Sequence, residues 1–438
     1  MKYFRRLPTK EEWSRSRKYA RGIRVLKMDT SIDLVVTQDV LLALQLRTGN
    51  ETLLPRLERF VCKNTTGDFI PSIPLFLSPK TTDIIIKFNT YPSTVMLALT
   101  IARFPTLCPH IKHLSLEPLP RNPTMIEAVS DMLLACNRDT LQWFFVDSPL
   151  TEDARGILYK LPKLRGLWAT MQGPTSLPLV ELPDLETICV RWDTGCDWLQ
   201  GFRGAKIGKL KAIDFRPTSG SAKIADFLEE FQSVVLTTSA QTSLSEFSFC
   251  TSQSWTPNYS SLLAFKQMTK LEIEFSCYGG CSSRVGDDII INLAQAMPEL
   301  EILQLGNQPC KAVTGVTFKG LIVLALRCPR LSKLRVHLQA NKLAEATSRI
   351  GPLFPSEPTA VIPQTNCALT DLQVGETPIS GPATLAVSLT LLQIFPEIHN
   401  IEYLNSRWGS VAEPIKLFKR IGGHIHHASK THLSPFLR

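Results

Sequence analysis

The chain has 438 residues, of which 44% are hydrophobic and 20% are charged, a composition that excludes wholesale disorder. No apolar run reaches the roughly 18 residues of a membrane span, and the N-terminus lacks the apolar core of a secretory signal, so we expect no membrane contact and no secretion. The eleven cysteines are odd in number and follow no framework spacing, as in a reducing compartment. We therefore expect a protein of the cytoplasm or nucleus.

The formal net charge of +9 is concentrated at the N-terminus. Residues 1–28 hold ten Lys or Arg, opposed only by Glu11 and Glu12. A repeat protein that follows phosphates needs cations along its whole binding face, so we expect no nucleic-acid partner. A mitochondrial presequence is poor in acidic residues, and Glu11, Glu12 and Pro8 argue against one.

The first predicted element is a helix that begins after Thr9. Thr9 and Glu12 have the spacing of a capping box, and the basic residues that follow through Lys18 lie where the helix dipole favours them. Gly22 ends the helix. We assign residues 1–22 to a basic N-terminal capping helix that covers the open core of the first repeat.

A unit of the form L-x-x-L-x-L recurs along the chain, and residues 297–305 contain its clearest copy, with Leu300, Leu303 and Leu305. Segments 83–88 and 271–275 are two further strand-like stretches in a looser register, which brings the predicted strands to about fourteen. Successive units are mostly about 21 to 38 residues apart, which leaves room for a helix in each repeat. The twelve clear copies begin at Ile23, Leu57, Ile111, Leu141, Leu164, Leu185, Leu210, Leu244, Leu300, Leu331, Leu369 and Ile398.

Between these strands, apolar residues recur at three- and four-residue intervals and predict helices. A proline often ends the helix just before the next strand, as in Cys108-Pro109 and Cys328-Pro329, and we expect both cysteines to be buried at that junction. The predicted helices cover residues 93–103, 125–136, 224–236, 287–297, 315–327 and 384–395.

These elements predict an α/β fold, a leucine-rich-repeat solenoid (horseshoe) with parallel strands on the concave face and helices on the convex face. We expect the solenoid to span residues 23–405, with a Pro-rich loop at 351–367. Residues 406–438 form a C-terminal cap and a basic tail. The simplest assembly is a monomer.

Chemical motifs are absent from the sequence. It contains no phosphate loop, nucleophile elbow or zinc-protease helix, so we expect a non-enzyme with no catalytic residue, cofactor or metal. Cys277 and Cys281 form either half a metal site or a plain turn, and the sequence favours the turn. Three tail histidines offer either weak metal binding or an exposed tail, and we favour the tail: His424, His426 and His427.

Strand alternation places one set of side chains on the concave surface. In each L-x-x-L-x-L unit the Leu residues point into the core, so the third and fifth residues and the one after the unit face the concave surface. Large aromatic residues beside arginines are typical of interface hot spots. The alternative is that adjoining loops cover the aromatic residues as a second core. The predicted protein-binding patch on this face consists of Trp143, Phe145, Trp168, Arg191 and Arg216.

A second set of charged residues lies on a late strand. Lys333, Arg335 and His337 alternate along it. They predict either a contact with an acidic partner or an ordinary solvated face.

The repeats of residues 19–405 resemble the leucine-rich repeats of fungal F-box proteins. Residues 8–15 (PTKEEWSR) and 19–26 (YARGIRVL) are similar to the helix and first strand that follow the F-box in that family. The resemblance implies that the repeats hold a substrate, while an F-box docks on the Skp adaptor of a cullin-RING ubiquitin ligase. Only residues 1–7 precede the match, so we expect the F-box to be absent from this chain. The Skp adaptor and a cullin are then partners only if an F-box lies upstream.

The sequence thus predicts a non-catalytic protein-binding subunit that recognises the substrate, itself unidentified, of an SCF-type ubiquitin ligase. The alternative is a stand-alone leucine-rich-repeat interaction scaffold unconnected to ubiquitin.

Overall fold

A computed structural model describes residues 9–29, 43–44, 46, 51–65, 67–89, 93–171, 180–192, 197–217, 227–251, 257–275, 285–306, 316–340, 365–375, 379, 383–403 and 405–419. The chain divides into two compact units. The first comprises residues 1–211 with 220–222 and 234–240, and the second comprises 212–219, 223–233 and 241–438.

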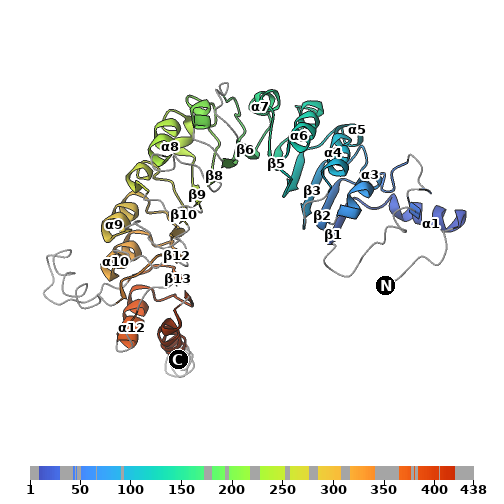
Figure 1. The fold of residues 1–438 in the computed structure, drawn as a ribbon. Helices are drawn as coiled ribbons and strands as arrows, with labels where there is room; N and C mark the ends of the chain where they lie inside the picture. The colour runs from blue at the N-terminus through green and yellow to red at the C-terminus, as the bar shows by residue number, and fades with distance from the viewer. Residues whose placement is uncertain are drawn as a thin grey trace, which may run out of the picture. The chain divides into compact units, whose positions relative to one another are not determined.

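The first unit contains seven parallel strands whose order in the sheet follows their order in the chain (Figure 1). They are β1 (Val25–Asp29), β2 (Arg59–Thr65), β3 (Asp83–Phe88), β4 (His113–Glu117), β5 (Trp143–Pro149), β6 (Gly166–Met171) and β7 (Thr187–Trp192). Its helices are α1 (Lys10–Ala20), α3 (Ile73–Phe76), α4 (Thr94–Ala102), α5 (Phe104–Leu107), α6 (Pro123–Ala135) and α7 (Glu152–Leu158), with single 3-10 turns at η1 (Gly67–Ser72) and η2 (Asp197–Phe202).

The second unit repeats this arrangement with seven more parallel strands. They are β8 (Ala212–Pro217), β9 (Glu246–Thr251), β10 (Lys270–Phe275), β11 (Ile302–Leu305), β12 (Lys333–Arg335), β13 (Asp371–Gly375) and β14 (Asn400–Tyr403). The helices are α9 (Asp287–Ala296), α10 (Phe318–Arg327) and α12 (Thr384–Ile394), with 3-10 turns at η4 (Tyr259–Leu262) and η8 (Ser406–Trp408). Helix α8 (Phe227–Val235) and the 3-10 turn η3 (Ser239–Thr242) contain residues of both units.

Strand alternation divides the side chains of each strand between two faces. In β4, Leu114 and Leu116 are fully buried beneath the helices, whereas His113 and Glu117 on the opposite face are part-exposed. The register aligns these leucines with those of the neighbouring strands, because Leu114 is paired with Ile84 on one side and Phe144 on the other. Each unit therefore has an apolar layer between strands and helices and a free strand face.

Backbone hydrogen bonds hold the start of each strand to the previous repeat. The amides of Arg165 and Gly166 both donate to the carbonyl of Gln142, at 2.7 and 3.0 Å, and those of Glu186 and Thr187 both donate to the carbonyl of Arg165 at the same two distances. This carbonyl ladder satisfies buried peptide groups where the ordinary pairing of parallel strands begins. The double-acceptor position is occupied in the first unit by Arg24, Glu58, Thr82, Lys112, Gln142 and Arg165, and in the second by Ser245, Thr269, Glu301, Ser332 and Thr370.

The helices begin and end where the sequence indicates. The Thr9 hydroxyl accepts from the amide of Glu12, whose carboxylate accepts from the amide of Thr9, so the predicted capping box is present. Asn122 caps α6 by accepting from the amide of Met125 at 3.0 Å. Cys108 and Cys328 are buried at the helix-to-strand junctions, as predicted from the proline that follows each of them.

The core of the second unit is rich in phenylalanine. Phe215 of β8 lies edge-on to Phe227 and Phe231 of α8, at centroid distances of 4.9 and 5.4 Å, and Phe231 also meets Phe247 at 5.1 Å. Such edge-on pairs stabilise a core beyond the area that they bury. Fourteen parallel strands in the described residues, connected by helices and 3-10 turns, confirm the predicted leucine-rich-repeat solenoid class.

Several predicted segments lie outside the described residues. They are residues 1–8 of the N-terminal segment, residues 351–364 of the Pro-rich loop and residues 420–438 of the basic tail. In the part of the chain that the structure describes, no helix is long and apolar enough to cross a membrane.

Candidate protein-binding face

The strand face of the first unit is organised in rows that run across the strands. The middle row pairs the third residues of successive strands, because Ile85 is paired with Ser115, Ser115 with Phe145 and Phe145 with Trp168. Most of its members are apolar, although they lie on the face away from the core. The row from β2 to β7 consists of Val61, Ile85, Ser115, Phe145, Trp168 and Cys189.

Three large aromatic side chains at the centre of this face contact one another. The ring of Phe145 lies 5.7 Å from that of Trp143 and 6.4 Å from that of Trp168, in the second case edge-on. His113 on β4 completes the group, at 6.2 Å from Trp143 and 5.9 Å from Phe145. All four side chains are part-exposed. We call Trp143, Phe145, Trp168 and His113 the aromatic cluster.

Glycine at position 166 makes room for the cluster. Trp143 is paired with Gly166 on the next strand, and a Cβ atom on Gly166 would lie 2.0 Å from Cε3 of the Trp143 ring. No side chain fits in that space, so the indole lies directly over the backbone of β6. The position of Trp143 thus depends on a glycine one strand away.

A buried carboxylate lies at the end of the face beyond the aromatic cluster. Asp147 has a side chain only 7% exposed, and it accepts from Arg121 Nη2 at 3.1 Å and from Thr170 Oγ1 at 3.2 Å. Arg191 of β7 also donates to it. Charge-assisted bonds of this kind are stronger than neutral ones, so Asp147 fixes both guanidinium groups in place.

The arginines in turn contact the aromatic rings. The guanidinium of Arg191 lies 5.3 Å from the centre of the Trp168 ring, and that of Arg165 lies 6.0 Å from the centre of the Trp143 ring. Both distances are in the range of cation–π attraction. Their side chains remain 26% and 46% exposed, so a molecule bound on this face can reach both.

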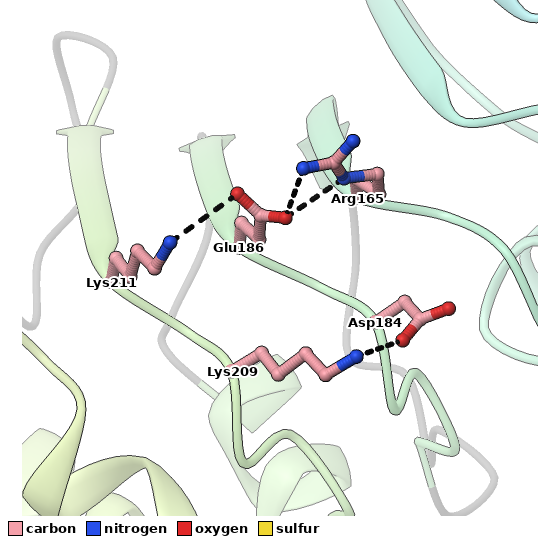
Figure 2. Close-up of polar contacts among 5 residues, drawn as sticks. All are labelled: Arg165, Asp184, Glu186, Lys209 and Lys211. Atoms are coloured by element: carbon pink, nitrogen blue, oxygen red, sulfur yellow. Dashed lines mark hydrogen bonds and ion pairs between the residues drawn. The ribbon is translucent and has the colours of Figure 1, made fainter.

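A row of ion pairs borders the face where strands β6 to β8 begin (Figure 2). Glu186 accepts from Arg165 Nε at 2.8 Å and lies 3.7 Å from Lys211 Nζ, while Lys209 donates to Asp184 at 2.6 Å. The bond from Arg165 lowers the pKa of Glu186 below its ordinary value, and the bond from Lys209 lowers the pKa of Asp184. These carboxylates therefore remain ionised under ordinary conditions and hold the basic side chains in place.

His113 lies between the aromatic cluster and a carboxylate. Its Nδ1 is 3.7 Å from Asp83, which also lies 3.4 Å from Arg59 Nη2. Burial lowers the pKa of His113 below its ordinary value, although the nearby Asp83 opposes that shift. The neutral imidazole then acts mainly as a fourth ring of the cluster.

The structure brings four of the five predicted patch residues together. Trp143, Phe145, Trp168 and Arg191 lie on β5 to β7 of the first unit and are linked by ring and cation–π contacts. Arg216 belongs to the second unit, where it lies 2.7 Å from Asp214. Whether a partner contacts these residues stays a prediction.

Sequence reasoning did not identify the groups that support the patch. The alternation rule also assigns Asp147 and Gly166 to this face, but it indicates no role for either. Arg121 and Arg165 lie outside the strands, so alternation does not reach them. The sequence contains one signal for this arrangement, which is a glycine, Gly166, at the position equivalent to Trp143 in the next repeat.

The strand face of the second unit is polar. Arg335 of β12 donates to Glu274 and, at 2.5 Å, to Gln373 Oε1, and Gln373 Nε2 donates to Glu402 at 2.6 Å. Only 17% of the Arg335 side chain is exposed, and His337 is buried. The predicted basic strand therefore directs its arginine toward groups of its own unit.

The described residues contain no group of three or more His, Cys, Asp or Glu that could hold a metal ion. Cys277, Cys281, His424, His426 and His427 lie outside those residues.

No family model matches the chain, and no curated protein matches it. Among solved structures, an internalin from Listeria monocytogenes aligns with 84% of this chain and 95% of its own, with 12% sequence identity and a TM-score of 0.35. Such a score carries no property of the internalin over to this chain.

Proposed function

We propose that this chain is a non-catalytic protein-binding subunit whose partner contacts the strand face of the first unit. The observation that carries the proposal is the aromatic cluster, in which part-exposed rings occupy a sheet face and arginines lie against them. Tryptophan, tyrosine and arginine dominate the binding energy of protein interfaces, especially where neighbouring groups fix them in place. Trp143, Phe145, Trp168 and Arg191 are the residues that we expect to bind.

Preorganisation of the face supports this proposal. Gly166 positions Trp143, and Asp147 positions Arg191, so few side-chain rotations need to be lost when a partner binds. Each rotamer-rich side chain immobilised on binding costs about 0.5–1.5 kcal/mol, and a fixed face avoids much of that cost.

The finer proposal concerns what the binding is for. The resemblance of residues 8–15, 19–26 and the repeats to fungal F-box proteins supports a role in substrate recognition for an SCF-type ubiquitin ligase, in the cytoplasm or nucleus. In this proposal the repeats hold the substrate, and the link to the Skp adaptor and cullin requires an F-box outside these residues.

Affinity purification of the chain from its own cells, followed by mass spectrometry, tests both levels. The wild-type chain is compared with a Trp143→Ala/Trp168→Ala variant and with a Gln304→Ala variant of the second unit as a matched control. We expect proteins that the wild type and the control recover but the double variant does not. Equal recovery by all three, with the fold intact by circular dichroism, would refute the binding face.

The same data address the ligase. Recovery of the Skp adaptor and a cullin with a gene product extended upstream, together with the same substrates, supports the finer proposal. Substrates recovered without adaptor or cullin by every form of the chain would instead make it a free-standing interaction scaffold.

A further inference from the structure

We propose that the face selects a polypeptide segment in which an apolar side chain is accompanied by an Asp or Glu, the carboxylate being bound by Arg191 and Arg121. The inference rests on the proposed function and specifies the chemistry of its ligand. It follows from the charges at one end of the aromatic cluster.

Positive side chains outnumber negative ones around Asp147. Two guanidinium groups donate to this single carboxylate, so the three side chains together carry one net positive charge. Asp147 itself is nearly buried, whereas Arg121 and Arg191 have 34% and 26% of their side chains exposed. What a ligand meets at this point is therefore two guanidinium edges and no carboxylate.

The exposed edges of the Arg121 and Arg191 guanidinium groups retain N–H groups that can donate to a ligand. A guanidinium carries five N–H donors, and Asp147 receives one hydrogen bond from each arginine, with Thr170 as its third donor. A carboxylate accepts in pairs from such donors, and two arginines held by one anion present a geometry suited to a second. An Asp or Glu side chain meets both requirements.

The distance along β5 between the aromatic rings and Asp147 limits how far apart the apolar and acidic side chains of the ligand can be. Trp143 and Phe145 lie on β5, and the guanidinium of Arg191 is held at the Asp147 end of the same strand. Strands rise about 3.3 Å per residue, so Phe145 and Trp143 lie roughly 7 and 13 Å from Asp147 along the strand. An extended ligand covers that distance in about two to four residues, which sets the separation between its apolar and acidic side chains.

A nucleic acid is the competing ligand, because arginines and aromatic rings also bind phosphates and bases. The neighbouring carboxylates disfavour it. Asp83 and Glu117 lie on strands β3 and β4 beside the cluster, and Glu186 and Asp184 border its other side. Each of these carboxylates is paired with a basic side chain, so the cations along the face are already partly neutralised, whereas a phosphate chain needs free cations along its whole length. The two guanidinium groups at Asp147 instead suit a single acidic side chain.

The test uses a random dodecapeptide library displayed on phage and selected against the full chain. We expect enriched peptides to contain an apolar residue with Asp or Glu two to four positions away. The affinity of one such peptide is then measured by fluorescence anisotropy, beside its Asn or Gln counterpart. Loss of the carboxylate is expected to weaken binding to the wild type at least about tenfold, the range of charge-assisted hydrogen bonds.

Two arginine variants complete a double-mutant cycle. With Arg191→Gln the acidic peptide and its amide counterpart are expected to bind within about twofold of each other, whereas Arg335→Gln in the second unit keeps the full difference. In the Arg191→Gln variant, Asp147 still accepts hydrogen bonds from Arg121 and Thr170. Thermal unfolding of the variant is measured alongside to show that the variant folds. Addition of 0.5 M NaCl is expected to reduce the difference in the wild type, since exposed charges are screened.

The outcomes separate this inference from the proposed function. Enriched peptides that need Trp143 and Trp168 but show no preference for an acidic residue would refute the inference and keep the binding face. Peptides that bind a Trp143→Ala/Trp168→Ala variant as well as the wild type would refute both, and so would a selection that enriches nothing. Displacement of the acidic peptide by a 20-nucleotide polyuridine at lower concentrations would also overturn the inference in favour of RNA.

Discussion

The strand faces of the two units use the same backbone to present different chemistry. On β4 to β7 the outward residues are aromatic rings with arginines against them, whereas on β10 to β14 they are carboxylates, amides and basic groups bonded to one another. An arginine is central to each: Arg191 lies on a tryptophan, and Arg335 lies between Glu274 and Gln373. In both units the repeat fixes where an outward side chain points. That residue and its neighbours, which include Arg121 and Arg165 outside the strands, determine whether the side chains stay part-exposed or bond to one another within the chain.

The largest expected effect removes the aromatic rings. Trp143→Ala/Trp168→Ala is expected to weaken binding of a recovered partner at least about 100-fold, because each hot-spot tryptophan contributes about 2 kcal/mol or more. Gln304→Ala on the polar face is expected to change the affinity by less than twofold. Titration by fluorescence anisotropy measures the affinity of both variants. Similar losses of affinity in the two variants would show that the two faces do not differ in binding.

Next in size is a substitution that displaces one ring. Gly166→Ala places a Cβ atom 2.0 Å from the Trp143 ring, so the indole must move, and overpacking of this kind costs about 1–3 kcal/mol. Gly156 in α7 is the matched control, because a Cβ there meets nothing within 4 Å and alanine favours a helix by about 0.5–1 kcal/mol. Urea unfolding is expected to shift the midpoint down for Gly166→Ala and slightly up for Gly156→Ala.

A third experiment compares the two carboxylates that hold arginines in place, Asp147 in the first unit and Glu274 in the second. Asp147→Asn removes the charge that holds Arg121 and Arg191, and we expect a loss of about 1–2 kcal/mol, reduced from the cost of a fully buried pair because the arginines are part-exposed. Glu274→Gln, whose side chain is 33% exposed, is expected to cost less than about 1 kcal/mol. Urea unfolding ranks them, and the reverse order would show that the polar network is the stronger anchor.

The smallest effect concerns the ion pairs at the start of β6 to β8. The pKa of Glu186 is lowered in the folded chain, so this carboxylate stabilises the fold above its unfolded pKa, and that contribution is lost as the pH falls through the folded value. Glu186→Gln is expected to cost under about 1 kcal/mol at pH 7. Its stability should also fall less than that of the wild type between about pH 5 and pH 3. Urea midpoints at these pH values measure the difference.

Much of the fold could be predicted because its signals are local and repeated. The spacing of Leu300, Leu303 and Leu305, found twelve times, determines both the strand and its inward face, and Thr9 with Glu12 determines where the first helix begins. Even the looser copies at β3 and β10 follow the same burial pattern.

The proposed binding face was harder to predict, since its support comes from residues far apart in the sequence. Asp147 and Arg191 are 44 positions apart, and Gly166 acts on a ring 23 positions before it. Alternation identified Trp143 and Arg191 as outward residues without showing what they contact. Arg216 was grouped with them because the repeat gave it an equivalent position, and it lies in the other unit with Asp214.

The carbonyl ladder determines which positions beside the aromatic cluster can change while the backbone bonds between repeats stay the same. The repeats are joined at this row mainly by peptide groups, and residues as different as Arg165, Glu58 and Gln142 occupy it. Where the residue is a threonine or serine, as at Thr82 and Ser332, its hydroxyl adds a hydrogen bond to the preceding carbonyl. Mutations in this row can alter the charge beside the aromatic cluster while the scaffold stays the same. A designer who wishes to change the charge beside this face can therefore begin with positions such as Lys112 and Gln142, whose peptide groups make the joint.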